Sequence, residues 1–307
     1  MKRLLLLASL VLLTACQSST PVINFHESVE QMSDVSKLLS VMEAKGIETT
    51  VLQGIPSDLL QYTEGEKVDL SGVVANHALL AEATKGANNL KWVCAINPNQ
   101  SDWASILDAC LEGGAVGVKT YLGYSYGHEA FLDDPSFKDF YDRLEQEGLF
   151  LVMPVNLSLY RSEFENVLSL HPNLQVIAPH YALSLGDLKT LREVMDAHPM
   201  LSLDTSFGHL DYVKTGFDLM TQNHEDIRQF MMDYQDRILF GTDNVMTTYE
   251  DKEAAWFEAL YADYLGFFTE SEKFTSQLDP QKEYQGLDLP KSVQKKVLFQ
   301  NAKALLQ

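Results

Sequence analysis

Three side chains that can bind a metal or carry a proton each follow a short apolar run. They are His26 after residues 22–25, His180 after residues 176–179 and Asp243 after residues 238–242. Two imidazoles and a carboxylate are suitable ligands for Zn²⁺ or a similar divalent ion. A water bound to that ion and deprotonated near neutral pH would be a nucleophile. Without a metal, Asp243 and His180 could instead work as an acid–base pair.

The apolar runs are typical of strands buried on both faces of a parallel sheet. We expect eight strands near residues 22–26, 49–52, 90–96, 115–121, 149–155, 174–178, 201–205 and 238–240. Helices are expected at residues 33–45, 76–85, 102–112, 135–147, 161–170, 185–197, 224–234 and 290–306. Alternating strands and helices predict an α/β fold with a parallel sheet, and eight units favour a closed (β/α)8 TIM barrel.

A (β/α)8 barrel keeps its active site at the carboxyl ends of its strands. His26, His180 and Asp243 would therefore face one central cavity. Other residues at this end have two open interpretations. Asp204 ends the seventh strand and is either a pocket acid or a partner for nearby backbone. Three tyrosines either line a substrate pocket or pack within a loop, and two histidines either bind a metal or are solvated. These residues are Tyr121, Tyr124, Tyr126, His128 and His209.

Five segments follow a recognisable order along the chain: Phe25-His26 and residues 114–119, 172–180, 237–243 and 301–306. On these segments the chain resembles, from residue 22 to the C-terminus, the amidohydrolase superfamily, in its amidohydrolase-related branch of decarboxylases and lactonase-like enzymes. The resemblance implies a TIM barrel of the metal-dependent hydrolase type and a small-molecule substrate. It also implies a divalent metal, zinc before others, held by His26 and Asp243, with His180 as the acid or base.

The sequence departs from the family pattern at two ligand positions. The first strand normally reads Asp-x-His-x-His, and here Ser28 stands in place of the second histidine. Asn156 stands where the fifth strand usually supplies a histidine. Lys119 is at the position of a carboxylated, metal-bridging lysine in other members, and in this branch the same lysine more often does not bind metal. Lys119 and Asn156 would then orient the substrate.

Three hypotheses follow. The first is a hydrolase of small molecules that uses metal-activated water, although two firm ligands are fewer than the three of a typical catalytic zinc site. The second is a barrel that has lost catalysis and binds a ligand or a protein partner. The third is a metal-independent lyase or hydrolase in which Asp243 and His180 exchange protons with the substrate.

The N-terminus predicts a secretory signal in residues 1–15. Lys2 and Arg3 precede an apolar stretch from residue 4 to 13, which is too short to span a bilayer. Residues 13–16 resemble the bacterial lipobox, in which Cys16 is acylated and becomes the new N-terminus. Residues 16–21 would form a tether, and Gln17 resembles the sorting residue of outer-membrane lipoproteins. We expect a lipoprotein of the outer membrane that faces the periplasm and contacts the membrane only through its lipid.

Removal of residues 1–15 leaves 307 − 15 = 292 residues, which suits one barrel domain over residues 22–307. Residues 264–289 are expected to form an ordered insertion against it. The net charge of −20 argues against a nucleic-acid partner. Cys94 and Cys110 are either two buried thiols or a disulfide, which only geometry can decide.

Overall fold

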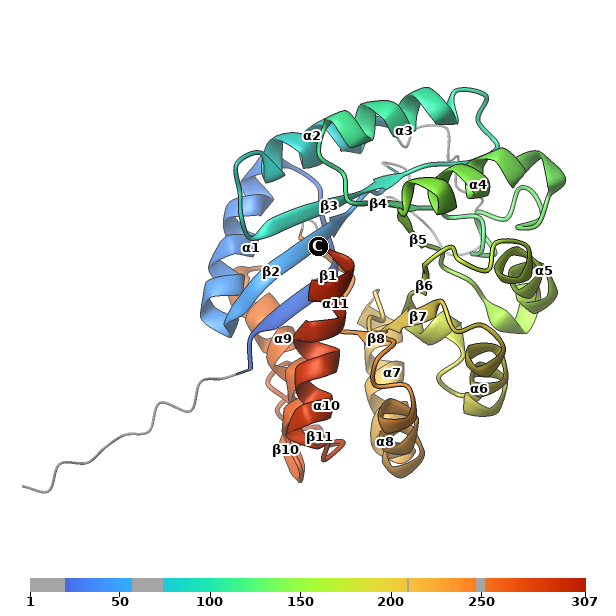
Figure 1. Cartoon of the computed structure of the whole chain (residues 1–307). Coiled ribbons are helices and arrows are strands. Elements are labelled where there is room, and N and C mark those ends of the chain that lie inside the picture. The colour runs from blue at the N-terminus through green and yellow to red at the C-terminus, as the bar shows by residue number, and fades with distance from the viewer. Residues whose placement is uncertain (1–19, 57–73, 209, 247–251) are drawn as a thin grey trace, which may run out of the picture.

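The fold is built on one curved sheet of nine parallel strands with helices on its outer face (Figure 1). The computed structural model describes residues 20–56, 74–208, 210–246 and 252–307. The strand order is β8-β7-β6-β5-β4-β3-β2-β1-β9. The strands are β1 (Val22–Val29), β2 (Ile47–Gln53), β3 (Leu90–Ala95), β4 (Gly117–Lys119), β5 (Phe150–Val152), β6 (Val176–Ala178), β7 (Leu201–Asp204), β8 (Ile238–Leu239) and β9 (Asn244–Met246).

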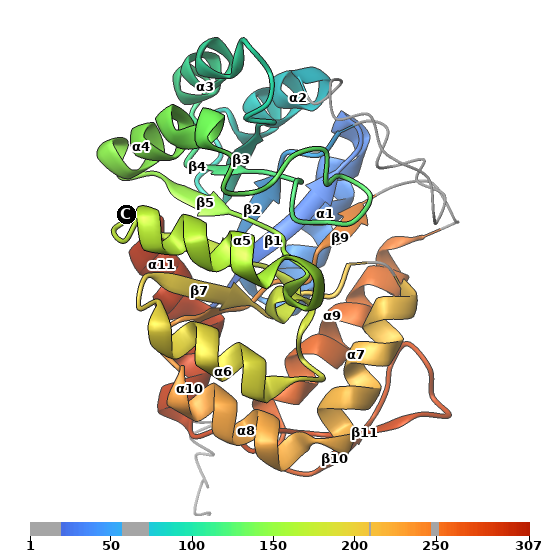
Figure 2. The ribbon, with the colours of Figure 1, turned by 90° about the vertical axis from the view of Figure 1, so that its right-hand side faces the viewer.

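Helices follow most of these strands and cover the sheet from outside (Figure 2). They are α1 (Met32–Lys45), α2 (Val74–Thr84), α3 (Trp103–Glu112), α4 (Lys138–Glu147), α5 (Leu157–Leu170), α6 (Leu188–Ala197), α7 (Leu210–Gln222), α8 (His224–Asp233), α9 (Ala254–Thr269), α10 (Lys291–Lys295) and α11 (Asn301–Leu305). The expected parallel α/β architecture is thus confirmed.

The apolar strands have two buried faces because the helices lie outside and a second apolar cluster lies inside. Successive residues of a strand point to opposite faces. In β3, Val93 belongs to the inner cluster, whereas Trp92 and Cys94 pack in the larger outer core. This double burial explains why the strands read as nearly continuous apolar runs.

Backbone hydrogen bonds join β1 to the segment that follows β8. The amide of Phe25 donates to the carbonyl of Phe240 at 2.8 Å, and the amide of Asp243 donates to the carbonyl of His26 at 2.7 Å. The chain then continues as β9, which pairs with the second half of β1. These hydrogen bonds bring Asp243 to the position beside His26.

At the amino end, the C-terminal segment lies between β1 and β8 (Figure 1). This segment contains the π-helical turn η6 (Lys296–Gln300) and α11. The amide of Phe240 donates to the carbonyl of Val297 at 3.1 Å, and Phe299 and Ala302 join the inner apolar cluster. The C-terminal segment therefore links β1 to β8 at the amino end of the sheet.

Helix α7 is absent from the sequence-based prediction, which passes directly from the seventh strand to the helix that corresponds to α8. Its buried residues Val213, Phe217 and Met220 have helical spacing. Gly216 interrupts the apolar pattern, and a Cβ there would lie 2.4 Å from the Phe207 ring. Glycine is therefore required by close packing inside a helix.

The segment expected as an insertion contains the end of α9 and a hairpin of β10 (Lys273–Thr275) and β11 (Glu283–Gln285). Asp263 of α9 ties the hairpin down, because it accepts from the amides of Gln277 and Leu278 at 2.7 and 3.2 Å. The predicted signal and lipidation residues lie outside the described residues. In the described part of the chain, no helix is long and apolar enough to cross a membrane.

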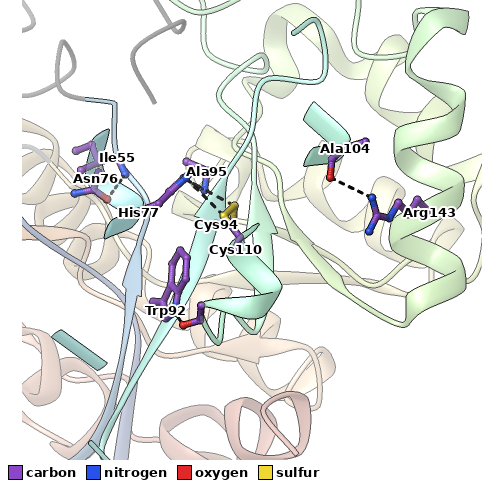
Figure 3. The surroundings of a disulfide bond; sticks show 10 residues. Ile55, Asn76, His77, Trp92, Cys94, Ala95, Ala104, Cys110 and Arg143 are labelled. Carbon is purple, nitrogen blue, oxygen red and sulfur yellow. Dashed lines mark hydrogen bonds between the residues drawn. A yellow bond between two sulfur atoms is a disulfide. The ribbon is translucent and has the colours of Figure 1, made fainter. Parts of the chain in front are cut away.

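Cys94 and Cys110 form a disulfide with a Cα–Cα distance of 6.0 Å (Figure 3). The bridge joins β3 to α3, and His77 of α2 lies against it. The amide of Ala95 donates to His77 Nε2 at 3.1 Å, and His77 Nδ1 lies 3.5 Å from Cys110 Sγ. Burial lowers the pKa of His77 to about 4, so the imidazole is neutral at pH 7. The open question about these cysteines is thus decided in favour of a bridge.

Candidate active site

His26 lies at the centre of a buried polar cluster at the carboxyl ends of the strands. Its Nδ1 is 2.6 Å from Asp204 Oδ2. Its Nε2 is 3.0 Å from Asp243 Oδ1 and 2.9 Å from Lys119 Nζ. Burial by itself lowers the pKa of His26, but the charges of Asp243 and Asp204 outweigh burial and Lys119, so the pKa is raised.

Asp204 holds this cluster together from the end of β7. Its side chain is fully buried and accepts from the amides of His180 and Ser206, each at 3.0 Å, and from the Ser206 hydroxyl. Burial alone would raise its pKa, but the charge and hydrogen bond of His26, with His180 and Ser206, lower it to about 2. Asp204 is therefore ionised at neutral pH.

His180 links the cluster to the loop that follows β4. Tyr124 OH lies 2.6 Å from His180 Nε2, and Ser206 Oγ lies 2.9 Å from His180 Nδ1. Burial lowers the pKa of His180 and raises that of Tyr124, so both are neutral near pH 7. The tyrosine hydroxyl then donates to Nε2, and the Nδ1 proton is donated to Ser206. A continuous hydrogen-bonded chain runs from Tyr124 through His180 and Ser206 to Asp204.

The backbone at this end of the sheet is strained. His180, Tyr181, Ala182 and Leu183 have φ of 59°, 52°, 53° and 52°, and Asp243 has φ of 51°. Left-handed conformations cost non-glycine residues about 1–2 kcal/mol each. Such strain persists where surrounding contacts enforce it, and it concentrates at functional sites. The bond from the His180 amide to Asp204 is one such contact.

Lys119 supplies a buried cation beside the two carboxylates. It ends β4, is 3% exposed, and its Nζ lies 4.9 Å from the centre of the Tyr121 ring. Burial lowers its pKa, and the negative charges of Asp243 and Asp204 oppose that effect. Two carboxylates are thus balanced by Lys119 and His26, which is what a buried charged cluster requires. The pKa of Asp243 is lowered: burial opposes ionisation, but His26, Lys119 and His180 outweigh it.

The donors at the strand ends do not fit a metal site with three protein ligands. The Lys119 ammonium lies against His26 Nε2, the atom that would bind the ion. In the described part of the chain, two groups place three His, Cys, Asp or Glu donor atoms within 4.8 Å of one another, and neither includes His26, His180 or Asp243. We therefore derive no chemical step through a metal.

Asn156 and Ser28, the two residues that depart from the family pattern, make their described contacts outside the His26 cluster. Asn156 Oδ1 accepts from the amide and hydroxyl of Ser158 at 3.1 and 2.6 Å, so this side chain caps the start of α5. No hydrogen bond in the described residues joins Asn156 to Lys119. Ser28 is buried in β1 and pairs with Val245 of β9.

A second buried polar group lies beside the first. Asn24, Thr242 and Tyr261 all donate to Glu27 Oε2, the first two at 2.8 and 2.7 Å. Burial raises the pKa of Glu27 to about 8, so its carboxyl is protonated at neutral pH. Because Thr242 precedes Asp243, this group fixes the turn that carries Asp243.

The remaining sequence candidates divide into three outcomes. His128 lies away from the cluster: its Nδ1 is 2.9 Å from the Leu122 carbonyl and its ring stacks on Tyr160 at 3.9 Å. His209 lies outside the described residues. The sequence left Asp204 and Tyr124 open, and both contact the cluster. Ser206 carried no signal, because a serine two residues past a strand is common.

The fold and this cluster together define a class of protein: a parallel α/β scaffold with a buried polar site at the carboxyl ends of its strands. The family model described as Amidohydrolase matches residues 47–307. The chain therefore belongs to the amidohydrolase family, as its sequence motifs predicted. No curated protein is significantly similar to it.

Solved structures share the fold at low sequence identity. An uncharacterized TIM-barrel protein from Bordetella bronchiseptica has a TM-score of 0.62 and 18% identity, over 93% of this chain and 98% of that one. A putative 2-pyrone-4,6-dicarboxylic acid hydrolase from Pseudomonas putida has a TM-score of 0.63 and 13% identity, over 94% and 98%. The 5-carboxyvanillate decarboxylase of Novosphingobium aromaticivorans, complexed with manganese, has a TM-score of 0.57 and 12% identity, over 94% and 97%.

Proposed function

We propose that this chain is a hydrolase or lyase of small molecules that works by acid–base chemistry at Asp243, His26, His180 and Lys119. One observation carries the proposal. His26 Nε2 lies 3.0 Å from an acceptor, Asp243 Oδ1, and 2.9 Å from a donor, Lys119 Nζ. When protonated, the nitrogen donates to Asp243, and when deprotonated, it accepts from Lys119. His26 therefore has a partner in both states, as proton transfer requires.

Asp243 is the residue of the cluster that would contact the substrate. Its side chain is 20% exposed, whereas His26 is fully buried. In the state in which His26 Nε2 is deprotonated, Asp243 would take the proton of a substrate or an attacking water and pass it to Nε2, which then donates to Asp243. Charge that develops on a substrate oxygen would be stabilised by the Lys119 ammonium, because a cation in a buried site interacts more strongly than in water. Tyr124 OH would give its proton to the leaving group. His180 Nε2, which lies 3.5 Å from Asp243 Oδ2, would carry the proton taken from the substrate back to Tyr124.

The family and its fold relatives support the reaction class. One relative is named as a hydrolase of a dicarboxylated pyrone and another as a decarboxylase of a carboxylated phenol. We therefore propose an oxygenated carboxylic acid or a lactone as substrate. The zinc-activated water predicted from the family pattern would need a third ligand and displacement of Lys119 from His26 Nε2.

The test is turnover of a panel of carboxylated pyrones, lactones and carboxylated phenols by the wild type, Asp243→Asn and Asp139→Asn. Asp139 is exposed on α4 and serves as a control for loss of one carboxylate. We expect Asp243→Asn to lower turnover by about 10²–10⁴, the usual loss when a general base is removed. Calorimetry should show little change in substrate affinity.

Three results would contradict the proposal. Equal turnover by wild type and Asp243→Asn would remove Asp243 from the chemistry. Binding of a panel member with no turnover by the wild type would favour the second hypothesis, a barrel that binds ligands without catalysis. If added zinc raises the turnover of the wild type but not that of Asp243→Asn, the result would favour metal-activated water.

We also propose that β8 and β9 are two halves of one eighth strand. The break at residues 240–243 lies between them, and hydrogen bonds from Phe25 and Asp243 join this segment to β1. The nine strands would then correspond to a (β/α)8 barrel. Amides of Phe25 and Asp243 that exchange with solvent as fast as those of exposed loops would refute this closure.

For localisation, we propose that Cys16 is acylated and anchors the protein to the outer membrane with the barrel in the periplasm. The lipobox-like residues 13–16 support the lipid, and Gln17 supports the outer-membrane destination. The disulfide between Cys94 and Cys110 agrees with an oxidising compartment. Membrane fractionation with mass spectrometry of the N-terminal peptide tests both parts.

A further inference from the structure

A second group of ligand-type side chains lies between α4 and α5, at the amino end of the strands. We propose that Asp142, Glu145 and His171 bind one divalent transition-metal ion of the zinc class. His171 Nδ1 lies 3.4 Å from Asp142 Oδ1 and 3.9 Å from Glu145 Oε2. Donors that bind zinc tetrahedrally at about 2.0–2.2 Å lie about 3.3–3.6 Å apart. The first distance fits, and the second needs only a small movement of the Glu145 side chain.

Each carboxylate has one oxygen held by a neighbour and the other directed at the histidine. Lys138 Nζ donates to Asp142 Oδ2, which leaves Oδ1 toward His171. The amide of Asn173 donates to Glu145 Oε1 at 2.7 Å, which leaves Oε2 toward His171. Outer partners of this kind orient the ligands of metal sites. The spacing of Asp142 and Glu145 by three residues puts both on one face of α4.

His171 is the observation that points to a ligand. The residue is 5% exposed, and its Nδ1 is a buried polar atom without a hydrogen bond in the described part of the chain. Its contacts with the carboxylates lack hydrogen-bond geometry, although Asp142 Oδ1 is 3.4 Å away. An unmade bond of a buried polar group costs about 1–3 kcal/mol. A metal ion on Nδ1 would satisfy the nitrogen and neutralise both carboxylates.

The surroundings suit an ion with an open coordination position. A cavity of about 210 Å³ lies beside the group and is lined by Lys138, Asp142, Leu170 and His171, among others. Its volume admits water as a fourth ligand. Burial lowers the pKa of His171, which favours the neutral imidazole that metals bind.

The experiment is calorimetric titration of zinc chloride into the full-length protein in detergent under non-reducing conditions. The wild type should bind one zinc at this group. Asp142→Asn and Glu145→Gln should each raise the zinc Kd by more than about a hundredfold, because loss of an outer partner alone costs about 10–100-fold. Asp139→Asn, on the same helix, should leave the Kd unchanged. Zinc should also raise the thermal midpoint of the wild type, since it binds the folded state.

The two substitutions keep the shape of the side chains, and circular dichroism verifies that both variants fold. Absence of zinc binding by the wild type would overturn the proposal. Binding that persists unchanged in Asp142→Asn and Glu145→Gln would do the same. Binding lost in Asp243→Asn and kept in Glu145→Gln would assign the ion to the strand-end cluster and refute the site between α4 and α5.

Discussion

Replacement of Asp204 by asparagine should destabilise the protein more than any other single loss of a carboxylate at the strand ends. Four groups are directed at this side chain: His26 Nδ1, the amides of His180 and Ser206, and the Ser206 hydroxyl. A carboxylate accepts all four. The amide group of asparagine brings two N–H donors, so at least one donor would face another donor in a fully buried site.

The expected loss of unfolding free energy in Asp204→Asn follows from the lowered pKa of Asp204 and from the hydrogen bond that asparagine cannot make. The pKa of Asp204 is lowered from 3.8 to about 2. A lowered carboxyl pKa stabilises the folded state above the unfolded value, and this stability is lost as pH falls through the folded value. The difference of about 1.8 units corresponds to about 2 kcal/mol. An unpaired buried donor adds about 1–3 kcal/mol, for a total of about 3–5 kcal/mol at pH 7.

Urea denaturation of the wild type, Asp204→Asn and Asp139→Asn from pH 7 to pH 2 measures this effect. The wild type should lose about 2 kcal/mol of its unfolding free energy between pH 4 and pH 2, in addition to losses shared by all three proteins. Asp204→Asn should lack that component, and Asp139→Asn should retain it. The reasoning is wrong if Asp204→Asn costs under 1 kcal/mol at pH 7 or keeps the wild-type acid dependence.

Three further predictions concern other parts of the chain. Cys16→Ser should move the protein from the membrane to the soluble fraction; protein that still sediments with membranes after a salt wash would exclude Cys16 as the anchor. Joint replacement of Cys94 and Cys110 by alanine should lower the unfolding free energy by about 3 kcal/mol, because the bridge closes a loop with a sequence separation of 16; unchanged urea denaturation would contradict this. Gly123→Ala should destabilise by about 1–3 kcal/mol, because the new Cβ would lie 1.8 Å from the Pro154 carbonyl oxygen; a wild-type thermal midpoint would show that this loop adapts freely.

The sequence predicted the elements whose surroundings are the same along their whole length. Strands buried on both faces are mostly apolar, so several appear as nearly continuous apolar runs such as residues 149–155 or 176–178. The order of these runs and helices was enough to predict a parallel α/β fold. Helix α7 escaped prediction because Gly216 stands in it for a packing reason, the nearby Phe207 ring.

The same rule predicted where chemistry would gather, because residues that follow parallel strands lie at one end of the sheet. It correctly singled out His26, His180 and Asp243 as neighbours in space. The rule could not decide whether Asp204 belongs to the site, since an aspartate at a strand end also forms hydrogen bonds readily with nearby backbone. It did not reveal that Lys119 contacts His26 Nε2, because the rule brings residues to one end of the sheet without fixing which atoms meet there.

Tertiary structure alone decided the balance of charge and the partners of each nitrogen. Burial raises the energy of every unpaired charge, so the cluster depends on which side chains meet. That meeting is a property of the whole curved sheet and not of any one segment. The pairing of Cys94 with Cys110 and the approach of Asp142 and Glu145 to His171 are of the same kind. Residue types and periodicity fix the elements locally, whereas distances of 3–4 Å between elements depend on how the whole chain packs.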